Sequence, residues 1–434
     1  MRTARALGAA AGLVMAAAHG QEIEDWNAKF QSTYIWQTKP ALRSPYQGEH
    51  SLIGAHEKSY SFTATTALGL RLGRQTEVYF NPEVAQGVPL SGLQGLAGFS
   101  NGEMARTSGS NLSLYRARLF VRHVIPIGED SEIVESATNQ LGSRYAKQRL
   151  TLTLGNVSLL DLFDANAYAH DPRLQFMNWA LMTHAAYDFA ADARGYTTGF
   201  AAEYKGAGWA LRGGRFLQPK LPNQLPLDER IGSHYGDQIE LEWPYALATD
   251  RPGVLRLLGW RGRAVMARYD DALAAARGGK PSLDAVRSSA QIKSGVGLNL
   301  EQALTPALGV FARAMRADGR TETYAFTEAD RSVSAGVSAR GAAWGRADDA
   351  LGVAVATHSL SGLHRRFLEA GGLSFFLGDG RLSYAPEQIF EAYYAWTPVK
   401  GLTLSFDYQR VRNPGYNADR GPASFVALRL HLEV

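Results

Sequence analysis

The sequence predicts an all-β protein: a transmembrane antiparallel β-barrel of about 16 strands with long outer loops and short periplasmic turns. Three observations lead to this prediction. Apolar and polar residues alternate along many short segments, short and long connections alternate between them, and the first twenty residues have the composition of an export signal. Alternation turns successive side chains to opposite faces of a strand, so one face can meet lipid and the other water.

The last segment shows the alternation most clearly. Leu428, Leu430 and Leu432 fall on one face, whereas Arg429 and His431 fall on the other. A soluble edge strand can alternate in the same way, but here the pattern recurs along the whole chain. The segments that carry it are 29–37, 62–72, 76–81, 114–122, 149–155, 195–204, 209–216, 238–243, 254–265, 292–301, 308–316, 331–340, 351–358, 387–396, 402–411 and 424–434.

The connections between these segments give a second signal. Tight links at 73–74, 205–208, 303–307 and 398–401 alternate with long polar ones, as periplasmic turns and outer loops do. Two links on the short side, 125–147 and 341–348, are longer than a tight turn. We expect each of them to hold a small local structure.

Residues 1–20 are interpreted as a signal peptide. Arg2 and Arg5 precede an apolar run from Ala6 to Ala18, and small residues follow at a cleavage site. The run is shorter than the roughly 20 residues that a spanning helix needs. No linker or composition shift divides residues 21–434, which are predicted to form one barrel domain in the bacterial outer membrane.

The composition excludes several other classes of protein. The chain has no cysteine, so disulfides, thiolate metal sites and cysteine nucleophiles are absent. Its basic residues are interleaved with acids, which argues against a nucleic-acid partner. No phosphate loop, nucleophile elbow, dinucleotide fingerprint or His-x-x-x-His spacing occurs, so we expect neither catalysis nor a cofactor or metal. Asp161 and Asp164 could form a glycosidase pair, although acid pairs on loops more often cap or meet solvent.

Long stretches of the chain resemble the carbohydrate-selective porin (OprB) family. They are TYIWQTKPALRSPYQGEHSL, TEVYFNPEVAQGVPLSGLQGLAGFSNGE, LYRARLFVR, DANAYAHDPRLQFMNWALMTHAAYDFAADARGYT, LNLEQALTPALGVFARAMRADGRTETYAFTEADRSVSAGV and GDGRLSYAPEQIFEAYY. The resemblance runs from about Asp25 to the end of the chain. It implies a 16-stranded outer-membrane barrel through which monosaccharides, glucose above all, diffuse down their gradient. One departure is the last residue, Val434, where bacterial barrels commonly have an aromatic residue.

The segment 114–122 is expected to supply positive charge to the lumen. If Tyr115 and Ala117 face lipid, the arginines between and beyond them face water, because a lipid-facing charge near mid-membrane costs about 2 to 4 kcal/mol. These arginines are Arg116, Arg118 and Arg122. Inward acids are expected to accompany them at Glu77, Glu240 and Glu242. Guanidinium donors and carboxylate acceptors together complement a polyhydroxylated sugar, although such pairs can also serve only to order the wall.

The longest loop region, 157–194, is the best candidate for an element folded into the pore. Leu159, Leu160, Leu162 and Phe163 are apolar in a segment that would otherwise lie in water, so we expect them to pack against the wall. The rest of the loop then supplies candidates for the constriction, which are Asp161, Asp164, His170, Asp171, Arg173, Asn178 and Trp179. Trp179 could stack on a pyranose while Asn178 and Asp171 bond its hydroxyls, or it could be a structural residue of the loop core.

The sequence therefore favours an outer-membrane porin for the passive, carbohydrate-selective diffusion of monosaccharides such as glucose into the periplasm. Two alternatives stay open: a general or anion-preferring porin, and an exported soluble β-fold that binds or hydrolyses carbohydrate. The expected partners are monosaccharides, outer-membrane lipid and lipopolysaccharide, and the barrel-assembly machinery during biogenesis. The sequence does not decide between a monomer and a homo-trimer.

Overall fold

A computed structural model describes residues 23–326 and 328–434 of the chain, so the predicted signal peptide, residues 1–20, lies outside the described residues. Sixteen strands form one closed antiparallel barrel. They are β1 (Trp26–Lys39), β2 (Glu57–Gly73), β3 (Thr76–Val88), β4 (Ser113–Pro126), β7 (Arg149–Val157), β8 (Thr197–Lys205), β9 (Ala210–Phe216), β10 (Tyr235–Ala248), β11 (Arg251–Val265), β12 (Ala290–Thr305), β13 (Leu308–Ala317), β14 (Arg331–Arg340), β15 (Ala350–Ser359), β16 (Glu387–Val399), β17 (Leu402–Arg412) and β18 (Ala423–Glu433).

The predicted fold class is confirmed, and each of the sixteen predicted segments overlaps one barrel strand. Neighbours in the chain are neighbours in the sheet, and β18 closes the barrel by pairing with β1, with Tyr34 opposite Leu430. Closure leaves no unpaired strand edge in lipid, where an exposed backbone N–H or C=O group would be costly.

Strand faces alternate as the sequence predicts. In β18, Leu428, Leu430 and Leu432 are exposed on the outside, whereas Arg429 and His431 are buried inside. Exposed leucine, valine and aromatic side chains occur around the whole wall, which gives the outer face its apolar character. Among the described residues, no helix has the length and apolar character needed to cross a bilayer.

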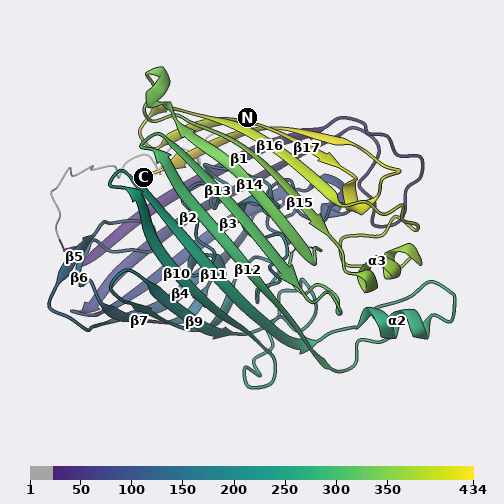
Figure 1. The fold of residues 1–434 in the computed structure, drawn as a ribbon, viewed down its shortest axis with the longest axis horizontal. Coiled ribbons are helices and arrows are strands. Elements are labelled where there is room, and N and C mark those ends of the chain that lie inside the picture. Colours follow the sequence, from purple (N-terminus) through teal and green to yellow (C-terminus); the bar gives the residue numbers. More distant parts are fainter. Residues whose placement is uncertain (1–22, 327) are drawn as a thin grey trace, which may run out of the picture.

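The two ends of the barrel differ. The long connections, with α2 (Tyr269–Ala275) and α3 (Gly362–Glu369), lie at one end, and the short turns lie at the other (Figure 1). Outer-membrane barrels place their short turns in the periplasm and their long loops outside the cell. Both longer links on the short side hold local structure, as predicted: a hairpin of β5 (Ser131–Val134) and β6 (Ser143–Ala146) in one, and a 3-10 helix, η3 (Gly341–Trp344), in the other.

One predicted strand orientation is wrong. The β3–β4 register shifts between Asn81 and Pro82, which pair with Arg118 and Arg116, so Ala117 is an extra residue on β4. Paired residues share a face. Arg118 therefore lies inside with buried Asn81, whereas Arg116 is exposed on the outside with Pro82.

The same bulge turns Tyr115 inward, not toward lipid as expected. Tyr115 pairs with Glu83, and its hydroxyl donates a 2.5 Å hydrogen bond to the Glu83 carboxylate. Strict alternation across the bulge assigned Tyr115 and Arg116 to the wrong faces. The assignment of Arg118 and Arg122 holds because both residues follow the inserted Ala117.

Candidate pore constriction

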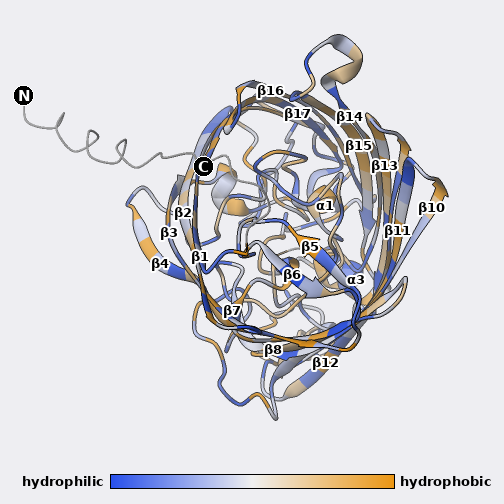
Figure 2. Ribbon diagram, turned by 90° about the vertical axis from the view of Figure 1, so that its left-hand side faces the viewer, coloured by the Kyte–Doolittle hydropathy of each residue, from blue (hydrophilic) through white to orange (hydrophobic). Residues whose placement is uncertain are grey.

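The β7–β8 connection, residues 158–196, folds into the barrel and fills much of its interior, as the sequence predicts; we call it the constriction loop. It contains the 3-10 helix η2 (Leu159–Asp161) and the short helix α1 (Trp179–Met182), which lies within the ring of strands (Figure 2). Leu159, Phe163 and Phe176 are fully buried against the wall and neighbouring loops. Apolar contacts therefore draw this loop inward.

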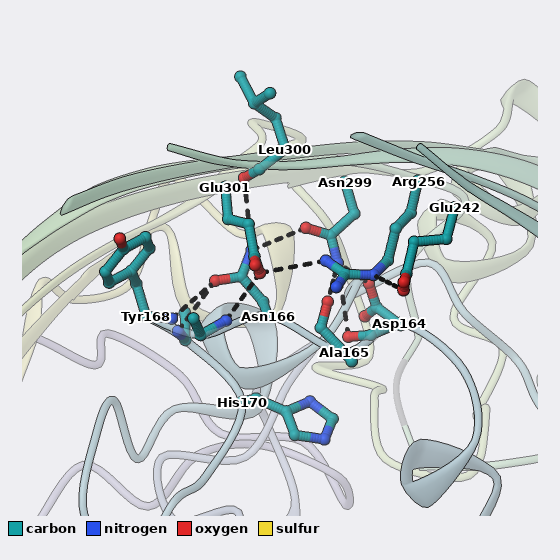
Figure 3. Close-up of polar contacts among 12 residues, drawn as sticks. Asp164, Ala165, Asn166, Tyr168, His170, Glu242, Arg256, Asn299, Leu300 and Glu301 are labelled. Atoms are coloured by element: carbon teal, nitrogen blue, oxygen red, sulfur yellow. Dashed lines mark hydrogen bonds and ion pairs between the residues drawn. The ribbon is translucent and has the colours of Figure 1, made fainter. Parts of the chain in front are cut away.

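A network of polar contacts anchors the first half of the constriction loop to β12 and its neighbours (Figure 3). The Asn299 amide donates to the Asp164 carboxylate at 2.6 Å and to the Ala165 carbonyl at 3.0 Å. Glu301 accepts a 2.8 Å bond from the backbone N–H of Ala167. Arg256 holds that carboxylate in place with a 3.1 Å ion pair. The wall thus presents side chains that satisfy the loop backbone.

Asp164 lies at the centre of this anchor and is not a catalytic acid candidate. Its carboxylate is fully buried, 3.1 Å from the Arg313 guanidinium, and it accepts from the Thr183 hydroxyl at 2.7 Å. Burial raises the pKa of Asp164, but the charge of Arg313, the neighbouring His184 and the hydrogen bond from Thr183 together outweigh burial and lower the pKa to about 2. Burial lowers the pKa of the adjacent His184 to about 4, so its imidazole is neutral at neutral pH.

Two further wall residues anchor the second half of the loop. Glu391 of β16 accepts hydrogen bonds from the backbone N–H groups of Met177 and Asn178, at 2.5 and 3.0 Å. The Asn178 side chain caps α1 by accepting from the Ala180 N–H, and its amide donates to Gln409. Asn178 is therefore fully buried in the loop anchor and does not border the pore.

The cavity that most of the candidate site residues line has a volume of about 570 Å³ and lies between the constriction loop and the wall formed by β1 to β4; we call it the main cavity. Five predicted site residues line it: Arg118, Arg122, Asp171, Arg173 and Trp179. The loop candidates Asp161 and His170 line it as well. Of the charged side chains that line the cavity, five are basic and four are acidic, so its wall is nearly charge-balanced.

Two ion pairs dominate this wall. Arg118 of β4 binds Asp161 of η2 through two hydrogen bonds of 2.6 and 2.7 Å. Arg173 binds Glu103 at 2.9 Å and approaches Glu83 at 3.8 Å. Both arginines keep part of their surface open to the cavity, with 15% and 26% of the side chain exposed. Each pair thus presents donors and acceptors side by side.

Glu103 is an acid of the cavity wall whose pKa is shifted upward. Burial raises its pKa, the charge of Arg173 opposes this, and the nearby Glu83 adds to the rise. The Thr63 hydroxyl donates a 2.5 Å hydrogen bond to the same carboxylate oxygen that accepts from Arg173. The net effect is a pKa above its usual value, so this carboxylate takes up a proton more readily than a solvent-exposed glutamate.

Trp179 forms part of the apolar edge of the cavity. Its ring stacks on Phe326, with centroids 4.8 Å apart, and meets Phe99 edge-on at 6.0 Å. Only 6% of the residue is exposed. The indole thus packs mainly within an aromatic cluster of the loops.

The remaining predicted site residues lie outside the main cavity. Glu77 is buried with Arg71, at 3.0 Å, and the hydroxyls of Tyr79 and Tyr145. Glu240 is fully buried and accepts from the Asp164 backbone N–H at 2.8 Å. Both therefore act in packing and not at the surface of the pore.

Glu242 and Arg122 border a second, smaller cavity of about 250 Å³ near the β5–β6 hairpin. Arg212 bridges the acids of that region, binding Glu203 at 2.7 Å and Glu242 at 3.1 Å. Arg116, which faces outward, borders neither cavity.

Several lining residues were missed from the sequence. Glu103 and Arg194 come from loops whose course a strand pattern cannot give, and Gln31 and Thr65 are inward positions of β1 and β2. Thr65 could have been found, since it alternates with the outward row of Phe62, Ala64, Leu68 and Leu70. A third cavity of about 690 Å³ opens among the long loops, where Arg106 lies over the Phe375 ring at 4.6 Å. It lies at the loop end of the barrel.

Residues 49–433 match the carbohydrate-selective porin, OprB family. The chain belongs to this family. Its fold is similar to that of OprB from Pseudomonas putida in the high-pH structure, with a TM-score of 0.70 and 16% identity over 94% of both chains. The low-pH structure of the same protein gives a TM-score of 0.50 and 11% identity, over 94% of this chain and 93% of that one. The outer-membrane channel DcaP of Acinetobacter baumannii gives 0.52 and 11%, over 94% and 97%.

No curated protein matches the sequence. Family and fold make this OprB-family protein an outer-membrane channel whose substrates are carbohydrates, and a channel rather than an enzyme.

Proposed function

We propose that this porin is selective for monosaccharides such as glucose and lets them diffuse passively into the periplasm. The observation that carries the proposal is the pairing of charges along the main cavity: Arg118 with Asp161, and Arg173 with Glu103. Each sugar hydroxyl both donates and accepts hydrogen bonds, so a wall of adjacent donors and acceptors can hold several hydroxyls at once.

The same pairing argues against the anion-preferring alternative. A free guanidinium attracts any small anion, but one that is bound to a carboxylate in two places contributes little net field. A neutral polar solute does not depend on a net field, so charge pairing does not weaken its binding to such a wall. The neutral side chains of Gln31, Thr65 and Gln140, which also line the cavity, extend the hydrogen-bonding surface without adding charge.

Single-channel recording tests the proposal. Glucose added to the purified porin in a planar bilayer is expected to reduce the ion current in a saturable, concentration-dependent way. A neutral glycol of similar size is the control for simple obstruction, and it should reduce the current less. Equal reduction by both solutes would identify a general porin. Strong anion selectivity without glucose block would identify an anion porin.

The proposal also includes export and assembly. We propose that residues 1–20 are removed during export and that the barrel-assembly machinery inserts residues 21–434 into the outer membrane. N-terminal sequencing of the protein purified from outer membranes should begin at Gln21. An intact Met1 in the mature protein would contradict this assignment.

A further inference from the structure

An apolar groove of about 390 Å³ runs along the outer wall over β14 to β17, in the part nearest the long loops. Arg410 and Arg412 of β17 form one border of the groove, and its outward floor side chains are Val333, Ala335, Val355, Thr357, Gln388 and Phe390. Cross-strand pairing places Arg412 in one row with Gln388, Thr357 and Val333. The groove is thus a continuous feature of four neighbouring strands.

A second pair of arginines lies on the other side of the groove. Arg316 of β13 and Arg331 of β14 are exposed and directly opposite each other across their strands. Like charges in direct cross-strand pairs are destabilising unless something neutralises them. From strand spacing, the nearest members of the two pairs, Arg331 and Arg412, are roughly 15 Å apart.

None of the four arginines forms an ion pair with a carboxylate of the described residues. Strands β9 to β11 show how this chain neutralises outward arginines elsewhere on the wall. There Asp237 lies between Arg215 and Arg261 and binds both, at 2.7 and 2.6 Å. The groove has no such acid, so its charges lack a counterpart in the described chain.

Position in the membrane limits what can supply that counterpart. An arginine on the lipid face costs about 2 to 4 kcal/mol at mid-membrane but only about 0 to 1 kcal/mol near the interface. The four arginines lie at the loop end of their strands, which is the outer leaflet side. A molecule that binds here has acyl chains for the groove and anionic groups for both arginine pairs.

We propose that this groove binds one bisphosphorylated, multiply acylated glycolipid of the outer leaflet, with the chemistry of lipid A. An acyl chain lies along the floor between Val333 and Phe390. One phosphate contacts Arg410 and Arg412, and the other contacts Arg316 and Arg331. Guanidinium groups bind phosphate oxygens through paired hydrogen bonds, which gives this lipid an advantage over a zwitterionic one.

Native mass spectrometry of the detergent-purified porin with added lipid A tests the proposal. The Arg410→Gln/Arg412→Gln variant should bind bisphosphorylated lipid A roughly tenfold more weakly than the unmodified protein, because it loses charge-assisted hydrogen bonds to one phosphate. Lys58→Gln/Arg116→Gln is the matched control. It removes two exposed outward charges at the loop end of β2 and β4, and it should bind as the unmodified protein does.

Further arms separate the alternatives. Monophosphorylated lipid A should bind the unmodified protein more weakly than the bisphosphorylated form, and Arg410→Lys/Arg412→Lys should retain part of the binding. The proposal is overturned if Arg410→Gln/Arg412→Gln binds lipid A as well as the unmodified protein does. It is also overturned if the control variant loses as much binding as Arg410→Gln/Arg412→Gln. A change of oligomeric state confined to Arg410→Gln/Arg412→Gln would instead make the groove a contact between copies of this chain. Glucose block should be unchanged in every variant, because these residues lie outside the pore.

Discussion

Arg429 of the last strand donates a 3.0 Å hydrogen bond to the carbonyl of Gln175, in the middle of the constriction loop. The same guanidinium nitrogen also donates to the carbonyl of Pro172. Only 1% of Arg429 is exposed. The alternation pattern predicts only that Arg429 faces inward. The structure shows that it is also one of the groups that hold the constriction loop across the pore.

Arg429→Leu should leave the barrel able to assemble and should loosen the loop. The side chain faces inward, so insertion meets no new polar group, but two loop carbonyls lose their donor at about 1 to 3 kcal/mol each. We expect a larger and noisier single-channel conductance. Leu428→Arg is the contrasting variant, because it places a charge on the lipid face of the same strand and should impair insertion. The heat-modifiable mobility of both proteins in gels, compared with conductance, checks the pair.

Arg118→Gln should make the pore more cation-preferring and weaken glucose block. The substitution keeps a hydrogen-bonding amide but leaves the Asp161 carboxylate without its cation, so the cavity gains net negative charge. The reversal potential in a salt gradient is the measurement. Arg116→Gln is the control, and its reversal potential should equal that of the unmodified protein because the side chain faces outward. A shift in the control would show that the bulge in β4 is misplaced.

Asp161→Asn should move the reversal potential in the opposite direction. Arg118 then lacks its carboxylate, and an unpaired guanidinium on the cavity wall attracts small anions. The Asn side chain can still accept from the Ser158 N–H that Asp161 caps, so η2 should remain folded. Unless the Arg118 and Asp161 variants shift the potential with opposite signs, the two residues do not act as one pair in the pore.

Lowering the pH should increase anion preference through Glu103. Burial raises the pKa of this carboxyl above its usual 4.5, so it becomes neutral at a higher pH than an exposed glutamate does. Its protonation leaves Arg173 less neutralised and adds positive charge to the cavity. Reversal potentials recorded while the pH is lowered from neutral should show the shift. Glu103→Gln should already have the low-pH selectivity at neutral pH and should lose that pH dependence.

The barrel could be predicted from the sequence because its signal is local. The alternation of apolar and polar residues can be recognised from neighbouring residues alone. Contact with lipid on one face makes this alternation strict, so all sixteen strands could be predicted. The signal failed in β4, where the inserted Ala117 reversed the faces of Tyr115 and Arg116. A bulge changes the spacing by one residue without a strong compositional mark.

The constriction could be predicted only in part. The apolar run around Phe163 showed that the loop turns inward, but not which polar residues would be used as anchors. Asp164, Asn178 and Glu240 are polar, as the cavity residues are, yet their side chains accept hydrogen bonds from backbone N–H groups of the loop or of its helix. That distinction depends on contacts between segments more than 70 residues apart, such as Asp164 with Glu240.

The anchors of the constriction loop are distributed around the circumference of the barrel. They involve Arg118 on β4, Glu240 on β10, Asn299 on β12, Arg313 on β13, Glu391 on β16 and Arg429 on β18. The loop therefore connects strands on different sides of the barrel through its interior and supports the wall from within. Lateral pressure from the membrane is then resisted by the loop contacts across the barrel interior as well as by the backbone hydrogen bonds between neighbouring strands. The cross-section open to solutes should therefore stay the same when the surrounding lipid changes in tension or thickness.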